Sequence, residues 1–439
     1  MKMERKEELN QGVELLWSFR SQKSKNLVEK ACYGLFFQYY FSVLFEEEIG
    51  EEFSFGFLYS RVEKGRFQWN IYQNWMNSFE NFLSLMTGRQ DVPELFDFLI
   101  SIEEKEKIRP LERYARKAIR ILWNLDVKKE EAEDFLALFL SCFFHEKKEE
   151  CPAEFAECMV RILFTEWKAT GKIPMNLYGT GKGLIPYELK QRDSAITLLV
   201  SEIDGRKDSF AKLVYFALDL EHRWVFPAGK EPIRLGASLW PYGETKEKEK
   251  NLFFPSACLP GQKEEYRCLD RWMSQLSEQG VFYFLCSAGF LYREGREKNL
   301  RCYLIEEKDL LDRIFFLPDD WSRGGFPKMV LLRLRKNRDK NEPIFMLDGS
   351  GQKGDCIEEL TGLFLDGGKE TEISCKLSLP LIREQEMNLN PARYLSLREK
   401  KDASSDYMEE TMRRLEAIDQ RLLEIDRQKK VYELELGID

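Results

Sequence analysis

From Cys151 to about residue 350, short apolar runs alternate with amphipathic stretches, and this alternation constrains the fold more than any other feature of the chain. The runs have the length of buried strands, whereas the stretches between them carry apolar residues at helical spacing. The predicted strands are Ile196–Val200, Val281–Cys286, Arg313–Leu317 and Met329–Leu334, and the clearest predicted helices are Ser209–Leu220 and Tyr266–Ser277. Strands that alternate with helices form mostly parallel sheets, so the sequence predicts an α/β, doubly wound domain.

The regions on either side of this domain have a different texture. Residues 1 to about 145 contain few Gly and Pro residues, and apolar residues such as Leu35, Tyr39 and Val43 recur at helical spacing. From about residue 366 the chain begins irregularly and ends in one long helical pattern. We therefore predict a helical domain at 1–145, an α/β domain at 146–365, and a C-terminal segment at 366–439 with a coiled-coil-like helix.

The C-terminal helical pattern contains an apolar seam at Leu415, Ile418, Leu422 and Ile425. This 3-4-3 spacing is typical of the a and d positions of a coiled coil. The seam either packs on the chain's own body or forms an arm that binds a partner protein. Its polar flanks, which include Arg421, favour the arm.

Composition excludes several classes of function. The net charge is −9, so any contact with DNA requires a local basic patch. The ten Cys residues contain no C-x-x-C pair, and the two His residues are His145 and His222, which argues against a metal site and against a Ser-His-Asp triad. The start of the chain lacks an apolar signal region, and we expect free thiols, a cytoplasmic location and no membrane contact.

A glycine-rich turn at Gly179–Gly183 is the first candidate for ligand binding. A Gly-x-Gly turn after a strand lets the backbone approach a nucleotide-like ligand without a Cβ clash. Glu202 follows about twenty residues later, at the end of an apolar strand, where a carboxylate can accept hydrogen bonds from a ribose. Each feature also has a purely structural interpretation. The glycines could serve only an ordinary turn, and Glu202 could be a solvated residue at the end of a strand.

Four segments in this region resemble motifs of the N-6 adenine DNA methylase family, the modification subunit of type I restriction-modification systems. They are Cys151–Phe164 (CPAEFAECMVRILF), Met175–Leu184 (MNLYGTGKGL), Ser201–Ile203 (SEI) and Gly236–Leu239 (GASL). The resemblance implies a Rossmann-like S-adenosylmethionine-dependent methyltransferase core, with an N-terminal helical domain and a C-terminal helical arm.

The same resemblance implies which residues bind the cofactor, S-adenosylmethionine. They are Gly179, Thr180, Gly181, Gly183, Glu202 and Ser238. The chain departs from the family pattern at Met175, where the family has an acidic residue, at Lys182, where it has a third glycine, and at Ala237, where it has a polar side chain. These departures remove polar partners of the cofactor.

The resemblance continues to the end of the chain and is most specific between Cys151 and Asn337. The downstream segments that carry it are Leu291–Glu297, Leu300–Glu306, Leu311–Pro318, Phe345–Ser350 and Asn388–Tyr394. Within them, Arg293, Arg296 and Arg301 are either phosphate contacts or ordinary surface charge. Trp272 and Trp321 are expected to pack in the core or cover the surface rather than stack on bases.

The family's catalytic motif is Asn-Pro-Pro-(Phe/Tyr) at the end of a strand. Its Asn side chain and a Pro carbonyl accept the two hydrogens of the adenine amine, and its aromatic ring stacks on the flipped base. By strand register and distance from Gly236, the motif falls on Ala257, Cys258, Leu259 and Pro260, which keep neither amide nor ring. An alternative at Asn251 to Phe254 keeps both, but a charge run precedes it instead of a buried strand.

The resemblance therefore implies an adenine DNA methyltransferase subunit that acts on DNA with a separate specificity subunit, docked through the C-terminal helix. The alternative is a catalytically inactive pseudoenzyme that keeps the fold as a DNA-associated scaffold in a restriction-modification or related defence complex. The loss of the Asn-Pro-Pro-aromatic motif favours the second interpretation, the inactive scaffold. The sequence therefore leaves both the active enzyme and the pseudoenzyme as alternatives.

Overall fold

The N-terminal part of the computed structural model is a bundle of helices. The structure describes residues 3–18, 25–88, 95–100, 105–146, 152–178, 183–201, 209–223, 232–239, 253–255, 258, 264–321, 328–339, 342–353, 356–396 and 421. The bundle consists of α1 (Met3–Ser18), α2 (Lys25–Leu44), α3 (Phe55–Glu63), α4 (Trp69–Thr87), α5 (Asp97–Ile100), α6 (Lys105–Leu125) and α7 (Ala132–Glu146), with short 3-10 turns η2 (Glu51–Phe53) and η3 (Lys129–Glu131). Leu35, Tyr39 and Val43 are all buried, as their spacing predicts.

Aromatic side chains hold this bundle together and join it to the α/β part. The rings of Phe36 and Phe139 stack at 3.6 Å, and Phe143 stacks on Phe210 at 3.5 Å. Phe210 lies on α10 (Ser209–Ala217), which belongs to the α/β part. Each stacked pair contributes about 0.5–1.5 kcal/mol beyond the area it buries. Because side chains of α10 belong to the same buried cluster as those of the bundle, the two parts share one continuous core.

The α/β part is built on a nine-stranded sheet with the order β3-β2-β1-β4-β5-β7-β6-β8-β9. Its strands are β1 (Met175–Tyr178), β2 (Leu198–Ser201), β3 (Glu221–Arg223), β4 (Ile233–Ser238), β5 (Leu276–Ser287), β6 (Leu311–Phe316), β7 (Met329–Arg335), β8 (Ile344–Asp348) and β9 (Ser374–Leu377). The first five in sheet order run parallel, and β7 is antiparallel to both of its neighbours.

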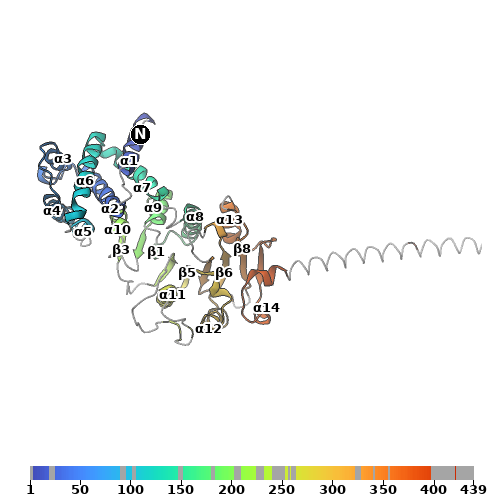
Figure 1. Ribbon diagram of the computed structural model, residues 1–439. Coiled ribbons are helices and arrows are strands. Elements are labelled where there is room, and N and C mark those ends of the chain that lie inside the picture. Colours follow the sequence, from blue (N-terminus) through green and yellow to red (C-terminus); the bar gives the residue numbers. More distant parts are fainter. Residues whose placement is uncertain are drawn as a thin grey trace, which may run out of the picture.

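Helices cover both faces of the sheet, as Figure 1 shows. One face carries α8 (Ala153–Ala169), α9 (Leu184–Arg192), α10 and α13 (Ile357–Asp366), and the other carries α11 (Glu264–Gln275), α12 (Arg296–Cys302) with the π-turn η5 (Tyr303–Glu307), and α14 (Leu379–Glu384). The short 3-10 turns η4 (Ala288–Leu291) and η6 (Asp319–Trp321) follow β5 and β6. Along β5, Phe282 and Phe284 enter one core while Val281 and Tyr283 enter the other, because successive strand residues point to opposite faces.

The α/β, doubly wound fold predicted from the sequence is confirmed, together with its four predicted strands and two predicted helices. The antiparallel direction of β7 was not predicted, since strand direction depends on pairings between distant segments. The strand β9 was not predicted either. The three domain boundaries stay predictions. The C-terminal seam lies outside the described residues. No helix in the described part of the chain is long and apolar enough to span a membrane.

Candidate functional site

The candidate site lies where β1 and β4 meet in the sheet. From β1 the chain adds β2 and β3 on one side, and then returns to add β4 and β5 on the other. In open α/β sheets, ligands bind outside the carboxyl ends of the strands at such a reversal of strand order. Tyr178 and Ser238 lie opposite each other at this point, and the Leu239 N–H donates to the Tyr178 carbonyl at 2.6 Å.

Gly183 is the one residue of the predicted cofactor turn that the structure describes; Gly179, Thr180 and Gly181 lie outside the described residues. Its φ is +91°, and a Cβ there would lie 2.8 Å from Val214 Cγ1 on α10. Both the backbone conformation and the close approach exclude a larger residue. The glycine thus lets the start of α9 pack against α10 directly after the turn.

Glu202 also lies outside the described residues, but the strand before it is placed. Ser201, the last residue of β2, pairs with Tyr178 at the end of β1. The chain therefore leaves β2 beside the β1–β4 crevice, on the side away from β4. This is the position that a ribose-binding carboxylate occupies in dinucleotide-binding folds.

Ser238, at the carboxyl end of β4, is fully buried, and its hydroxyl has no hydrogen-bond partner among the described residues. Ser287, at the end of the neighbouring β5, is 7% exposed, and its hydroxyl is likewise unpartnered in the described structure. An unsatisfied buried hydroxyl costs about 1–3 kcal/mol. Each can both donate and accept, so these strand ends offer polar contacts to a bound molecule. Ser287 was not identified as a candidate from the sequence. The feature that could have identified it is its position at the end of a predicted buried strand.

The segment predicted to carry the catalytic motif lies elsewhere. The N–H groups of Phe253 and Phe254 donate to Asp270 Oδ1 of α11 at 2.9 and 2.7 Å. The Phe253 ring also lies 6.0 Å from the Lys336 ammonium. Lys336 directly follows β7, whose last residue pairs with Val281 near the start of β5. The segment therefore lies toward the amino ends of the parallel strands.

Cys258 shares this environment. Its N–H donates to the Pro255 carbonyl at 2.9 Å, and the side chain is buried in the same core as Phe254. Burial raises the pKa of the Cys258 thiol. The structure thus places Cys258 and Phe254 away from the carboxyl ends of β1 and β4, and both placements of the motif stay predictions. Ala257, Leu259, Pro260 and Asn251 lie outside the described residues.

Arg301 is neither a phosphate contact nor a surface charge, so both interpretations of the sequence are wrong for this residue. Its side chain is fully buried and donates to the carbonyls of Phe290, Arg293 (2.8 Å) and Met387 (3.0 Å). It fastens the turn after β5 to the segment that follows α14. Trp272 and Trp321 are buried, which confirms their predicted role in the core.

A buried hydrogen bond lies close to the end of β5. The Tyr266 hydroxyl donates to Glu297 Oε1 at 2.7 Å, and burial raises the pKa of Tyr266. Arg293 lies 3.5 Å from the same carboxylate and is half exposed. This cluster packs α11 against α12. Among the residues the structure describes, no group of three or more His, Cys, Asp and Glu side chains could hold a metal ion.

Part of the chain is similar to proteins of a known family. Residues 235–403 match the family model of the N-6 DNA Methylase. A stretch of 153 residues is 27% identical to the type I restriction enzyme MpnII methylase subunit of Mycoplasma pneumoniae, and it covers 33% of this chain and 28% of that protein. The match thus spans less than a third of the curated relative.

Two solved structures share the fold. The methyltransferase subunit of a type I restriction-modification system from Streptococcus thermophilus is 17% identical, with a TM-score of 0.70 over 89% of this chain and 99% of that one. A chain from a structure of type I restriction-modification complex assembly is 14% identical, with a TM-score of 0.52 over 88% and 93% of the two chains. At these identities the likeness establishes the architecture.

Proposed function

We propose that this chain, a member of the N-6 DNA methylase family, is the methyltransferase-like subunit of a type I restriction-modification or related defence system. The observation that carries the proposal is the crevice between β1 and β4, where the buried Ser238 hydroxyl has no partner among the described residues. The subunit would bind S-adenosylmethionine there and act on DNA together with a specificity subunit.

The residues around this crevice fit the cofactor in part. S-adenosylmethionine would supply an electrophilic methyl group. The backbone of the glycine turn would lie close to the cofactor, Glu202 would accept hydrogen bonds from its ribose hydroxyls, and the Ser238 hydroxyl would form a hydrogen bond with it. Met175 and Ala237 are both fully buried in the apolar core on the α8 face. They cannot replace the acidic and polar side chains that the family has at these positions. We therefore expect the cofactor to bind weakly.

On the substrate side, we propose that the catalytic motif corresponds to the residues that follow β4. The amine to be methylated must reach the cofactor, and β4 is the strand that ends beside β1. The sequence after Ser238 is Leu239-Trp240-Pro241-Tyr242, which shares its second proline and its aromatic residue with Asn-Pro-Pro-(Phe/Tyr). Residues 240–242 lie outside the described residues.

In this alignment Leu239 stands where the catalytic amide would be. Its side chain is 1% exposed and belongs to the apolar core on the α8 face. A leucine cannot accept the hydrogens of the adenine amine, and the loss of one such group costs about two to three orders of magnitude in rate. We therefore favour the catalytically inactive scaffold over the active methyltransferase.

Incorporation of tritiated methyl groups into DNA, with the specificity partner present, separates the two. We expect background incorporation for the natural chain, and the largest gain of any single change from Leu239→Asn, which restores the amide. Thermal unfolding must first establish that this variant folds. Incorporation by the natural chain that Asn251→Ala abolishes would contradict the scaffold and restore the Asn251 alignment.

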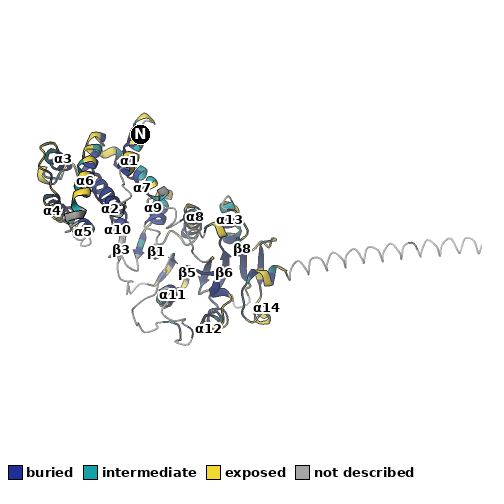
Figure 2. Ribbon diagram, viewed as in Figure 1, coloured by how far each residue is buried: buried dark blue, intermediate teal, exposed yellow. Residues whose placement is uncertain are grey.

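DNA binding requires a basic patch, and one face of α6 is a candidate for it. Arg109, Arg113, Lys117 and Arg120 are exposed and follow one another at steps of four, four and three residues, which places them on one face of the helix. Figure 2 shows this exposed stripe along α6, opposite its buried face. In a chain with a net charge of −9, such a concentration of cations suits the phosphate backbone.

Salt dependence tests this DNA contact. Replacement of both Arg109 and Arg113 by Gln should reduce the slope of log affinity against log salt by about two, because each lost phosphate contact lowers it by about one. The double variant Lys6→Gln/Lys30→Gln removes the same charge from other helices and should leave the slope unchanged. Equal slopes for the α6 variant and the natural chain would rule out α6 as the contact.

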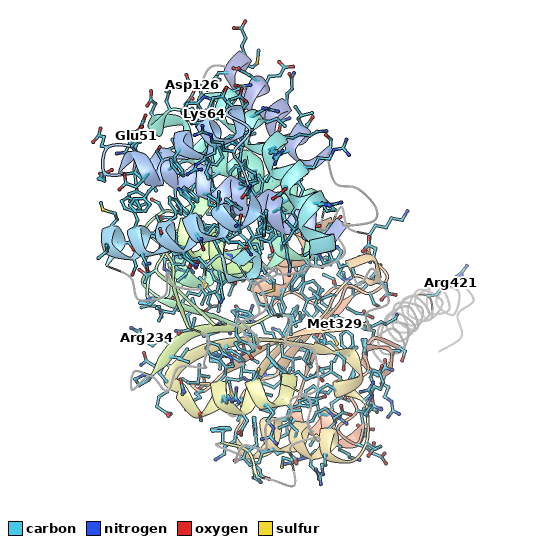
Figure 3. The ribbon with its side chains drawn as sticks, turned by 60° about the vertical axis from the view of Figure 1, so that its left-hand side comes forward. Glu51, Lys64, Asp126, Arg234, Met329 and Arg421 are labelled. Atoms are coloured by element: carbon cyan, nitrogen blue, oxygen red, sulfur yellow. The ribbon has the colours of Figure 1, made fainter. Side chains whose placement is uncertain are left out.

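We propose that the specificity subunit binds the seam of Leu415, Ile418, Leu422 and Ile425. A charge at its centre, Leu422→Glu, should abolish co-purification of the partner, because an a-position side chain packs into a hole of the facing helix. Arg421→Glu is the matched control: Arg421 is exposed, and Figure 3 labels it at the edge of the molecule. Equal capture by the two variants would exclude the seam as the interface.

A further inference from the structure

A pocket of about 440 Å³ opens within the N-terminal helical bundle. It lies between the end of α2, the turn that follows it, the start of α3 and the end of α6. Figure 3 labels Asp126 of this pocket in the helical half of the molecule, well separated from Arg234 and Met329 of the sheet. Its volume falls within the range of about 300–1,000 Å³ that small-molecule sites occupy.

The floor of the pocket is buried and carries two hydroxyl groups. Ser42 is 7% exposed, and its hydroxyl has no hydrogen-bond partner among the described residues. The Tyr39 hydroxyl accepts from the Val127 N–H at 3.0 Å. Burial raises the pKa of Tyr39 to about 12, so the phenol is neutral at pH 7 and keeps a proton to donate. A polar group of a ligand would therefore find both a donor and an acceptor at the floor.

The rim carries an exposed indole ring. Trp123 is 41% exposed and stacks on Tyr59 with the ring centroids 5.0 Å apart and the planes at 14°. A glycine makes room for it, since a Cβ on Gly56 would lie 3.1 Å from the ring. Across the pocket, Phe55 packs against Tyr39 with the centroids 4.9 Å apart. Aromatic faces thus lie both at the rim and at the floor.

The rim is also acidic. Asp126 forms an ion pair with Lys128 at 2.7 Å, but Glu46 is exposed and has no basic group within 4.0 Å among the described residues. Arg5 caps the end of α6, where it donates to the Leu125 and Asp126 carbonyls at 2.7 and 3.1 Å. The end of α2 carries partial negative charge beside Glu46, because a helix is negative at its carboxyl end. A cation is favoured beside Glu46, and it is also attracted to the face of an indole ring.

We propose that this pocket binds a small organic cation. Its apolar body would lie against Trp123 and Phe55, its charge beside Glu46, and a hydrogen-bonding group would reach Ser42. The site is separate from the β1–β4 crevice and does not depend on S-adenosylmethionine or DNA binding. A free metabolite and an arginine side chain of a partner protein share this chemistry.

Calorimetric titration of the full chain with benzamidine, and with the neutral benzamide as its isostere, tests the proposal. We expect a saturable benzamidine site with a dissociation constant near or below about 1 mM, as small fragments reach in preformed pockets, and about tenfold weaker binding of benzamide. Equal binding of the two, or no saturation up to about 10 mM, overturns the proposal.

Three variants locate the site. Trp123→Ala should weaken benzamidine binding about threefold to tenfold, and Glu46→Gln about twofold to fivefold. Glu48→Gln removes an equally exposed carboxylate from the same turn, outside the pocket lining, and should leave binding unchanged. Natural affinity in both pocket variants, with thermal unfolding intact, would place the cation elsewhere and overturn the proposal.

A second arm of the titration distinguishes the two sources of the cation. The peptide acetyl-Gly-Arg-Gly-amide presents an arginine side chain without other charge. If it binds more tightly than benzamidine, and Glu46→Gln weakens both, the occupant is a partner's arginine. If benzamidine binds more tightly, with the same response to Glu46→Gln, the occupant is a free small molecule.

Discussion

One serine on an edge strand of the sheet and one on an inner strand are equally buried but differ in their surroundings. Ser374 on β9 is fully buried, and its hydroxyl donates to the Lys369 carbonyl at 3.0 Å and accepts from the Thr371 N–H at 2.9 Å. Ser238 on β4 is equally buried, yet its hydroxyl has no partner among the described residues. The polar group near β9 serves the fold, whereas we propose that the one at the end of β4 contacts a ligand.

The side of the sheet that contains β5 to β9 also holds the main buried ion cluster of the described structure. Arg333 on β7 pairs with Glu166 of α8 at 3.0 Å and with Asp312 of β6, and Tyr283 on β5 donates to the same Glu166 at 2.6 Å. The cluster therefore ties one helix to three strands. This side of the sheet therefore satisfies its buried charges within the fold, whereas the buried hydroxyl at the end of β4 has no partner among the described residues.

Removal of Arg333 should have the largest effect. Arg333→Ala leaves the buried carboxylates of Glu166 and Asp312 without their main partner, and should lower the free energy of unfolding by about 3–5 kcal/mol. Lys328→Ala breaks the exposed pair with Asp319 and should cost less than about 1 kcal/mol. Denaturant unfolding followed by circular dichroism measures both. Similar losses for the two would show that the cluster is not part of the framework.

The same cluster predicts a loss of stability in acid. Burial alone would raise the pKa of the Asp312 carboxyl, but Arg333, Arg335 and Arg313 hold it below its usual value. A carboxyl with a depressed pKa in the folded state stabilises the fold above its unfolded pKa of about 3.9, and this stability is lost as the pH falls through the folded value. Below about pH 4, the natural chain should therefore lose stability more steeply than Asp312→Asn. Parallel curves would contradict this.

Ser374→Ala should have an intermediate effect. It removes the bonds that the hydroxyl forms with the Thr371 N–H and the Lys369 carbonyl, each worth about 0.5–1.5 kcal/mol, while the Thr371 N–H keeps its bond to the Ser374 carbonyl at 3.1 Å. The variant leaves the backbone of β9 and the burial of this position unchanged. The decrease in the free energy of unfolding therefore measures the contribution of the side-chain hydrogen bonds. A change below about 0.5 kcal/mol would mean that these bonds do not stabilise the sheet.

Ser238→Ala should have the smallest cost: we expect no loss of stability and a gain of up to about 1–3 kcal/mol, which is the penalty for burying an unsatisfied hydroxyl. The substitution removes a buried hydroxyl that has no partner in the described structure, and so breaks no bond that the fold uses. The same denaturant experiment compares it with Ser374→Ala. A loss as large as that of Ser374→Ala would mean that the Ser238 hydroxyl supports the fold and is not reserved for a ligand.

The sequence predicted what local patterns determine. Apolar runs such as Val281–Cys286 mark buried strands, and the spacing of Leu35, Tyr39 and Val43 marks a buried helix face. It could not show that Ile233–Ser238 lies beside β1, because strand order depends on contacts between distant segments. For that reason the motif was sought downstream, at Ala257 to Pro260. The burial of Arg301 was equally hidden, since its partners are backbone carbonyls, one of them at Met387, 86 residues away.

S-adenosylmethionine binding by calorimetry on the purified full chain tests the central claim most directly. The claim is that a cofactor site at Gly183 and Ser238 lacks the polar partners that Met175 and Ala237 replace. Each lost charge-assisted hydrogen bond costs about 1.5–3 kcal/mol, so we expect a dissociation constant weaker than about 100 μM. A low-micromolar dissociation constant would contradict the account, because it would mean that the cofactor site is intact.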